Sequence, residues 1–329
     1  MALNLSGYAV DFKAVQEAVT RLSPFIHRTP IVTSGTADER VGRRLFFKAE
    51  NLQQTGAFKI RGALNAVLQL KESNPAVKGV ATHSAGNHGQ ALAAAARNCQ
   101  LSCTVVIPNT APQVKVNAIK GYGANVVFCE PTPQDRKATS ERVCKEAGLT
   151  FVSPYDDVHV ISGQGTLGLE LLEQVSDMDA IVVPVSGGGL AAGVCLAVKS
   201  VKPQIKIFAA EPAGKDLEVS LRAGERLWPE PPRHLETIAD GLRTQQLGQI
   251  TWPIARDCLE KTVLTMSDDE TVAAMKFVFE RMKLVVEPSG AVPVAAVMSD
   301  RFRLLGSDIK KVSVIMSGGN VNLDKLPWC

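Results

Sequence analysis

Residues 52–63 read Leu-Gln-Gln-Thr-Gly-Ala-Phe-Lys-Ile-Arg-Gly-Ala, and Lys59 within them is the residue on which the interpretation of this sequence depends. Lys59 follows a short uncharged turn and precedes an apolar helical pattern that ends near Lys71. A lysine in a dry, crowded environment has a lowered pKa, and its neutral amine is a nucleophile toward an aldehyde. The common alternative is a solvated lysine at a helix start. The remainder of the chain decides between the two.

Composition and charge are those of an ordinary globular protein. The 329 residues are 45% apolar and 21% charged, with a net charge of +3 and no clustered basic run. This length favours two lobes over one, and a chain without clustered basic residues is not expected to bind nucleic acid. The seven cysteines are odd in number and scattered, which is typical of reduced thiols in a cytoplasmic protein.

No stretch reads as an export signal or a membrane span. The first fifteen residues lack the basic and apolar regions of a signal peptide. Residues 180–198 carry no charge, but Pro184 and a glycine cluster interrupt them. We therefore expect a buried strand and helix there, and no contact with a membrane.

Short apolar strands alternate with helical patterns along most of the chain. Strands are expected at 79–82, 102–107, 125–129, 150–152, 180–185, 206–210 and 311–316, and helices at 11–22, 89–97, 112–120, 135–146, 164–175, 191–201, 268–283 and 288–300. Such alternation predicts an α/β fold in which mostly parallel sheets carry helices on both faces. Residues 212–254 are rich in proline and glycine and are expected to be irregular.

A polar break at residues 71–79 marks a lobe boundary. We predict a large domain formed by residues 1–78 and 157–329, and a small domain formed by residues 79–156.

The first candidate binding loop is Ser186-Gly187-Gly188-Gly189-Leu190, between a buried strand and a helix. Three glycines let backbone N–H groups converge, and a helix N-terminus adds partial positive charge, so the loop suits a phosphate. The spacing Gly187-x-Gly189-x-x-Ala192 also fits a dinucleotide fingerprint, with Glu211 near the position of the ribose-binding acid. Taken alone, the loop fits either ligand.

A second polar loop, His83-Ser84-Ala85-Gly86-Asn87-His88, lies between an expected strand and an alanine-rich helix. Ser84, Asn87 and the free N–H groups of the loop suit a substrate carboxylate. The alternative is a plain helix cap made by Ser84 or Asn87, which uses the same donors. The two histidines are not spaced as a metal pair, and we expect local hydrogen bonds to satisfy both.

A third loop, Ser317-Gly318-Gly319-Asn320, follows the last strand. The Ser317 hydroxyl could hydrogen-bond a ring nitrogen, although a strand-to-loop turn alone explains the residues equally well.

Four segments, namely the turn with Lys59 and the loops at 83–88, 186–190 and 317–320, occur in this order along the chain. Together they resemble the pyridoxal-phosphate (PLP) enzymes of the tryptophan-synthase-β type, which have PLP fold type II. The resemblance covers essentially the whole chain and is closest to the eukaryotic serine racemases and the serine and threonine dehydratases. The matching segments are FKIRGALNAV (58–67), GNHGQAL (86–92), ETIADG (236–241), TWPI (251–254), ERMKL (280–284) and SGGNVNL (317–323). The resemblance displaces the dinucleotide interpretation.

The resemblance implies a role for each cofactor-binding residue. Lys59 binds PLP covalently and then acts as the base at the substrate Cα, and Phe58 packs near the cofactor ring. Gly187, Gly188 and Gly189, flanked by Ser186 and Leu190, bind the phosphate. Asn87 reaches the 3-hydroxyl group of PLP, and Ser317 faces the pyridine nitrogen.

The resemblance also implies that an amino-acid substrate binds at Ser84, Ala85, Asn87, His88, Arg136 and Asp240. It further implies a homodimer whose small domain closes over the substrate.

Two departures bear on the reaction. In serine racemases a second serine, which is the acid/base on the face opposite the lysine, occupies the position of Ala85. An alanine methyl cannot donate a proton, and general acid–base groups contribute roughly 10²–10⁴-fold to rate. Tyr155 likewise stands where racemases have an asparagine, and both departures resemble dehydratases. We therefore predict mainly β-elimination of L-serine and L-threonine, with weak racemisation; the alternative is a serine racemase in which another group or a water supplies the second proton.

The metal and effector sites of the family are only partly matched. Glu211 matches a ligand for Mg²⁺ or Ca²⁺, with Lys215 and Asp216 completing the candidate set. Leu217 occupies the position expected for the second carboxylate. Tyr122, Gln90, Lys283 and Asn320 match an ATP site, but Gln16 and Gln54 replace an acid and a lysine, which argues against ATP as an effector.

Overall fold

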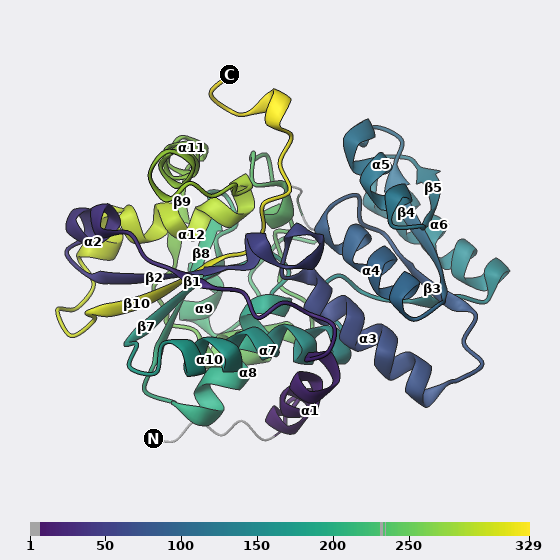
Figure 1. Cartoon of the computed structure of the whole chain (residues 1–329), viewed down its shortest axis with the longest axis horizontal. Coiled ribbons are helices and arrows are strands. Elements are labelled where there is room, and N and C mark those ends of the chain that lie inside the picture. The colour runs from purple at the N-terminus through teal and green to yellow at the C-terminus, as the bar shows by residue number, and fades with distance from the viewer. Residues whose placement is uncertain (1–6, 231–232, 234) are drawn as a thin grey trace.

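The computed structural model describes residues 7–230, 233 and 235–329, and it has two lobes, each built on its own sheet (Figure 1). The larger sheet has six strands in the order β1-β2-β10-β7-β8-β9, and the smaller has four in the order β5-β4-β3-β6. Every described strand pairing is parallel except β1 with β2. The expected class, α/β with mostly parallel sheets, is confirmed.

The strands have the following bounds. In the large sheet they are β1 Ile31–Val32, β2 Arg44–Ala49, β7 Ala180–Pro184, β8 Lys206–Pro212, β9 Leu264–Met266 and β10 Lys311–Met316; in the small sheet they are β3 Gly79–Thr82, β4 Ser102–Pro108, β5 Asn125–Cys129 and β6 Thr150–Phe151.

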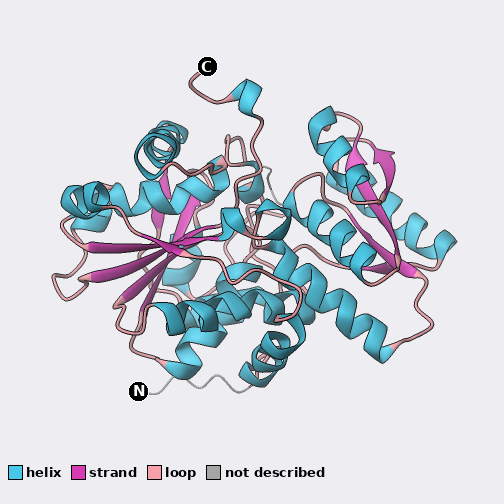
Figure 2. Cartoon of the chain, in the orientation of Figure 1, coloured by secondary structure: helices cyan, strands magenta, loops and turns pink. Residues whose placement is uncertain are grey.

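Helices cover both faces of each sheet (Figure 2). The helices before the small sheet are α1 Phe12–Leu22, α2 Gly35–Val41 and α3 Lys59–Ser73; those of the small lobe are α4 Asn87–Asn98, α5 Gln113–Gly121 and α6 Pro133–Ala147. The later helices are α7 Val158–Gln174, α8 Gly189–Val201, α9 Leu217–Ala223, α10 Thr251–Cys258, α11 Asp268–Phe277, α12 Pro288–Met298 and α13 Asp300–Arg303.

Alternate side chains of the central strands pack into two hydrophobic cores, one on each face of the large sheet. In β7, Ile181 and Val183 pack in the core that contains α7, α8 and α10, whereas Ala180 and Val182 pack in the core that contains α11 and α12. This is the pattern of a strand buried on both faces, and it explains why residues 180–185 read as a continuous apolar run.

The α3 helix lies between the two lobes (Figure 1). Ile60 and Leu64 of α3 share a core with Val80 and Leu92 of the small lobe. The opposite side of α3 packs closely on α7, where the Gln164 side chain and the Val160 carbonyl leave no space for a Cβ at Gly62. Lys59, the first residue of α3, is therefore held by both lobes.

Two expectations for the elements need correction. Residues 212–254 are not irregular throughout, because α9 lies within them and α10 begins at Thr251. The helix expected at 268–283 ends at Phe277, after which one wider π-helical turn, Val278–Met282, leads to Lys283 with φ of +59°. In the described part of the chain, no helix has both the length and the apolar character needed to cross a bilayer.

Candidate active site

Lys59 lies inside the protein rather than on its surface. The preceding turn is joined to the loop after β10, where Ala57 pairs with Gly318 and the Phe58 N–H donates to the Ser317 carbonyl at 3.1 Å. Lys59 is half-buried, and its Nζ donates to the Pro154 carbonyl at 2.6 Å and lies 5.2 Å from the centre of the Phe58 ring. Desolvation lowers the pKa of this amine to about 8, which makes it a better nucleophile near neutral pH.

A buried charge network fixes the start of α3. The Arg61 guanidinium donates to both oxygens of Glu50 at 2.8 Å and to Glu170 at 3.0 Å, and Lys48 also binds Glu170. Arg61, Glu50 and Lys48 are fully buried. Because Arg61 is two residues from Lys59, this network holds the backbone that carries the amine. Its partners lie far apart in the sequence, which gave no signal that they meet.

The glycine loop is confined on two sides. At Gly187 a Cβ would lie 2.3 Å from the ring of Tyr155, and at Gly189 it would lie 2.8 Å from the Tyr155 carbonyl oxygen. Gly188 has φ of +94°, a conformation that favours glycine. The Gly187 carbonyl accepts hydrogen bonds from the Thr251 hydroxyl at 2.7 Å and the Gly248 N–H at 3.1 Å.

Lys59 and the glycine loop belong to one site. The Pro154 carbonyl accepts a hydrogen bond from the Lys59 amine. The next residue, Tyr155, places its ring over Gly187. Gly189 and Leu190 begin α8, and no side chain of the described residues caps that helix. A half-buried amine linked through Pro154 and Tyr155 to an uncapped glycine loop fits an aldehyde cofactor that carries a phosphate.

The loop before α4 also lacks a side-chain cap. Its N-cap is Gly86, and no described side chain bonds the first turn, so the alternative of a plain cap by Ser84 or Asn87 does not hold. Ser84 instead accepts from the Gly86 N–H at 3.3 Å, inside the loop. The first N–H groups of α4 therefore remain available for an anion such as a substrate carboxylate. Ala85, in the same loop, is half-buried.

The two histidines of this loop are only partly satisfied. His88 Nε2 lies 3.2 Å from the Val152 carbonyl oxygen, and burial lowers the pKa of His88 to about 3, so the ring is neutral with its proton on Nε2. Nδ1 of His88 and Nδ1 of His83 are buried without a partner among the described residues. The expectation that local hydrogen bonds satisfy both rings is therefore wrong for these two atoms.

Asn87 is oriented by two residues, one of which sequence reasoning missed. Its Nδ2 donates to Glu287 Oε1 at 2.7 Å, and its Oδ1 accepts from Asn320 Nδ2 at 2.9 Å. Glu287 is buried, and desolvation, with the nearby Asp240 carboxylate, raises its pKa to about 8. A glutamate before Pro288 at a helix start usually reads as a solvated acid, so nothing in the sequence indicated its burial.

Ser317 is 4% exposed and directly follows β10, next to the turn that carries Lys59. Gly318 adjoins Glu287, because a Cβ at Gly318 would lie 2.5 Å from Glu287 Oε1. The structure therefore brings together Lys59, Ser317, Asn87 and the glycine loop, through Tyr155 and Glu287.

Arg136 and Asp240 approach the site from different lobes. Arg136, on α6, lies within electrostatic reach of His83 and Tyr155. Burial lowers the pKa of His83, to which the Arg136 charge adds, and burial raises the pKa of Tyr155, which the Arg136 charge only partly opposes. Arg136 Nε is buried without a partner in the described chain. Asp240, in the large lobe, pairs with Lys115 of α5 in the small lobe. This pair bridges the two lobes at the candidate substrate side.

The candidate metal residues do not form an oxygen cage. Glu211 is buried, but Asp216 is exposed, and Leu217 is fully buried in the position expected for the second carboxylate. The only oxygen that Lys215 offers, its carbonyl, already accepts from Trp228 Nε1 at 2.7 Å. Within the described residues no group of three His, Cys, Asp or Glu side chains could hold a metal ion. This donor set does not fit Mg²⁺ or Ca²⁺, which need several oxygen ligands.

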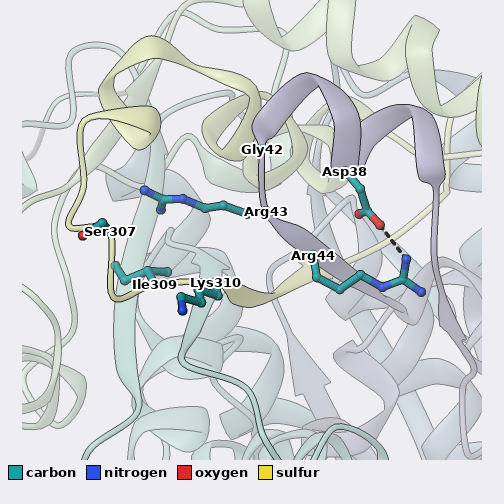
Figure 3. A pocket seen from close by; sticks show the side chains of 7 residues that line it. All are labelled: Asp38, Gly42, Arg43, Arg44, Ser307, Ile309 and Lys310. Atoms are coloured by element: carbon teal, nitrogen blue, oxygen red, sulfur yellow. Dashed lines mark hydrogen bonds and ion pairs between the residues drawn. The ribbon is translucent and has the colours of Figure 1, made fainter.

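A surface hollow elsewhere is lined by basic residues but has no link to this site (Figure 3). Arg43, Arg44 and Lys310 line it, and Arg44 is paired with Asp38 at 2.8 Å. It lies where β2 and β10 begin, whereas Ser317 and the Lys59 turn follow the other ends of these strands. Ligands of parallel α/β sheets bind at the carboxyl ends of strands, so this hollow is not the active site.

Comparison with known proteins supplies the family. A model of the family of pyridoxal-phosphate dependent enzymes matches residues 22–318. The chain is 47% identical to the serine racemase of Arabidopsis thaliana over 328 residues, which make up 99% of this chain and 98% of that protein.

Two solved structures are similar over almost their whole length. A pyridoxal 5'-phosphate-dependent aspartate racemase is 50% identical, with a TM-score of 0.96 and coverage of 98% of this chain and 99% of that chain. A threonine deaminase from T.th. is 39% identical, with a TM-score of 0.88 and coverage of 95% and 99%. The chain belongs to the family of pyridoxal-phosphate dependent enzymes and has PLP fold type II, and this confirms the resemblance found in the sequence.

Proposed function

We propose that this protein is a PLP-dependent ammonia-lyase of the serine racemase and threonine deaminase group, which converts L-serine, and also L-threonine, into a 2-oxo acid and ammonia. The observation that carries the proposal is Ala85, a methyl group in the loop before α4 where racemases of this group carry a hydroxyl. A single proton-transferring residue, Lys59, is enough for elimination, whereas racemisation needs a donor on each face of the substrate.

Different residues of the chain would attach the cofactor, bind its phosphate and bind the substrate carboxylate. PLP, when bound, withdraws electrons from the bond to the Cα hydrogen of the substrate. The Lys59 amine, with its pKa lowered to about 8, attaches the cofactor and then takes the Cα proton. The cradle of residues 186–190 holds the phosphate, and the N-terminus of α4 with Ser84 binds the substrate carboxylate.

Ser317 and Asn87 tune the cofactor. The Ser317 hydroxyl would hold the pyridine nitrogen, and a hydroxyl cannot protonate that nitrogen as a carboxylic acid would, so the bound cofactor would draw less negative charge away from Cα. Retained charge at Cα favours loss of the β-hydroxyl. The Asn87 amide is held by Glu287 and Asn320 and would bind the 3-hydroxyl group of the cofactor.

A second candidate is racemisation, of serine or of aspartate. The named racemases that are 47% and 50% identical to this chain favour it. Under this alternative another group or a water supplies the proton that Ala85 cannot.

The test measures both products on one purified, PLP-saturated sample. With L-serine, we expect pyruvate, measured by a coupled dehydrogenase, to form at least about tenfold faster than D-serine, measured by chiral chromatography. Ala85→Ser should raise D-serine formation by roughly 10²-fold, the contribution of one acid–base group. Ala85→Gly is the matched control and should leave the ratio of products unchanged.

A wild-type enzyme that makes mainly D-serine, or D-aspartate from L-aspartate, would overturn the lyase proposal. So would an Ala85→Ser variant with unchanged racemisation.

A further inference from the structure

Lys215 is a buried lysine that has no place in the site described above. It follows β8, is 0% exposed, and is among the largest fully buried side chains of the described chain. Its Nζ donates to two main-chain carbonyls, those of Thr244 and of Gln245, the latter at 2.7 Å. A lysine is almost never fully buried unless it is paired, so this arrangement requires an explanation.

The Glu211 carboxyl is close enough to Lys215 for each charge to act on the pKa of the other, although the two side chains form no ion pair within 4 Å. Glu211 is 1% exposed; its Oε1 accepts from the Leu217 N–H and the Thr265 hydroxyl, both at 3.3 Å, and its Oε2 has no partner among the described residues. A buried carboxylate together with two carbonyl oxygens is an environment that attracts a hard cation. Here Lys215 Nζ already donates to the two carbonyls, so these oxygens are engaged by the lysine rather than by a metal ion.

The carbonyls that Lys215 binds begin the segment that supports the glycine loop. Thr244 and Gln245 lead directly to Gly248 and Thr251, which both donate to the Gly187 carbonyl. Anchoring residues 244–245 therefore fixes the position of the phosphate cradle from behind, without contact with the cofactor.

We propose that Lys215 is a built-in cation: its ammonium takes the place of a bound metal ion at the carbonyls of Thr244 and Gln245, near Glu211, and it positions the segment 244–251 behind the glycine loop. The enzyme is then independent of divalent cations at this place in the fold. The second half of the proposal rests on the glycine loop being the phosphate site.

The wild-type holoenzyme gives the first test, and it needs no variant. We expect its thermal unfolding midpoint, and its rate with L-serine, to be the same in EDTA and in millimolar MgCl₂ or CaCl₂. A midpoint that falls in EDTA and returns with Mg²⁺ or Ca²⁺ would overturn the proposal.

Two variants separate the charge of Lys215 from its bulk. Lys215→Ala leaves a cavity beside Glu211, and Lys215→Met fills the space without a charge. Both should unfold at a lower temperature than the wild type and bind PLP roughly tenfold more weakly, the loss of about one charge-assisted hydrogen bond. Ethylammonium, propylammonium or K⁺ should restore the midpoint of Lys215→Ala toward that of the wild type, and should not restore Lys215→Met, whose side chain occupies the cavity.

A purely structural lysine gives a different result. The proposal that Lys215 acts as a built-in cation is wrong if no added cation raises the unfolding midpoint of Lys215→Ala. It is also wrong if Lys215→Met is as stable as the wild type. The midpoints are read independently of turnover. If an added cation restores the midpoint of Lys215→Ala but the variants bind PLP as tightly as the wild type, only the proposed link to the glycine loop is wrong. Neither the midpoint nor the PLP affinity depends on whether the enzyme is a lyase or a racemase.

Discussion

At the residue scale, the unusual acid of this site is Glu287, which is buried against Asn87. Its pKa of about 8 means that the folded protein holds a proton that the unfolded chain releases near its ordinary pKa of 4.5. Because the folded state binds more protons across the interval between pH 4.5 and 8, its stability falls as the pH rises through that interval. The carboxyl is therefore expected to act as a neutral hydrogen-bonding group at neutral pH.

Glu287→Gln tests this assignment, because an amide resembles the protonated acid and can still accept from Asn87. We expect its unfolding midpoint, relative to the wild type at matched PLP concentration, to rise by a few degrees between about pH 5 and pH 8.5, about 1 kcal/mol or more for a chain of this size. The difference between the two proteins cancels other titrating groups. Parallel midpoint curves across this pH range would show that Glu287 is ionised throughout.

The sequence indicated the site residues that are recognisable by their type and local pattern. It did not indicate the roles that depend on burial and on contacts between distant segments. Lys59 and the three glycines stand out because an isolated lysine in an apolar turn and a glycine run are visible in one dimension. Glu287 acquires its partner Asn87 only when distant segments meet. Tyr155 was noticed for its departure from the racemase pattern, but nothing in the sequence indicated that its ring covers Gly187. Single-sequence patterns carry no information on such pairs.

At the element scale, the start of α3 depends on the buried network of Arg61, Glu50 and Glu170. Removing one partner of a buried ion pair leaves an uncompensated charge and typically costs about 3–5 kcal/mol. We expect Arg61→Met to lower the free energy of unfolding by that amount in urea denaturation. Arg142→Ala, which breaks an exposed pair with Glu146 on α6, is the control and should cost less than about 1 kcal/mol.

The double variant Glu50→Gln with Arg61→Met should be more stable than the sum of the two single effects, since it removes both charges. An Arg61→Met protein as stable as the control would contradict the role of this network.

Elements with strong periodicity were predictable, and short elements within polar stretches were not. The strand at 311–316 and the helices near 191–201 and 12–22 lie close to where the apolar pattern placed them. The α9 helix has only seven residues and lies among prolines and glycines, so local composition outweighed its pattern. The end of α11 was missed because the helical pattern continues through the π-helical turn that follows it.

At the scale of the whole molecule, the two lobes meet across the site through the Lys115–Asp240 pair. Both side chains are about one third exposed, so the pair contributes at most about 1 kcal/mol. We expect Lys115→Ala to raise KM for L-serine by about two- to fivefold, because closure of the small lobe over the substrate loses this contact, while PLP affinity stays the same. Lys137→Ala, on the exposed pair with Glu141 of the same lobe, is the control and should leave KM unchanged. A Lys115→Ala enzyme with wild-type KM would show that the pair has no part in closure.

The alternation of strands and helices predicted two α/β lobes, but it did not predict how α3 connects them. The sequence placed α3 before a lobe boundary, whereas in the structure its apolar residues also enter the core of the small lobe. A helix that serves two cores has no distinctive pattern, because both faces read simply as apolar.

The most direct measurement is borohydride reduction of the PLP-loaded protein followed by peptide mapping with mass spectrometry. We predict a visible absorbance band that borohydride abolishes, and the reduced cofactor attached to the peptide that contains Lys59 and to no other. Lys59→Ala should show neither the band nor the attached cofactor. Cofactor attached to a different lysine, or an unmodified Lys59 peptide in a protein that still turns over L-serine, would contradict the account.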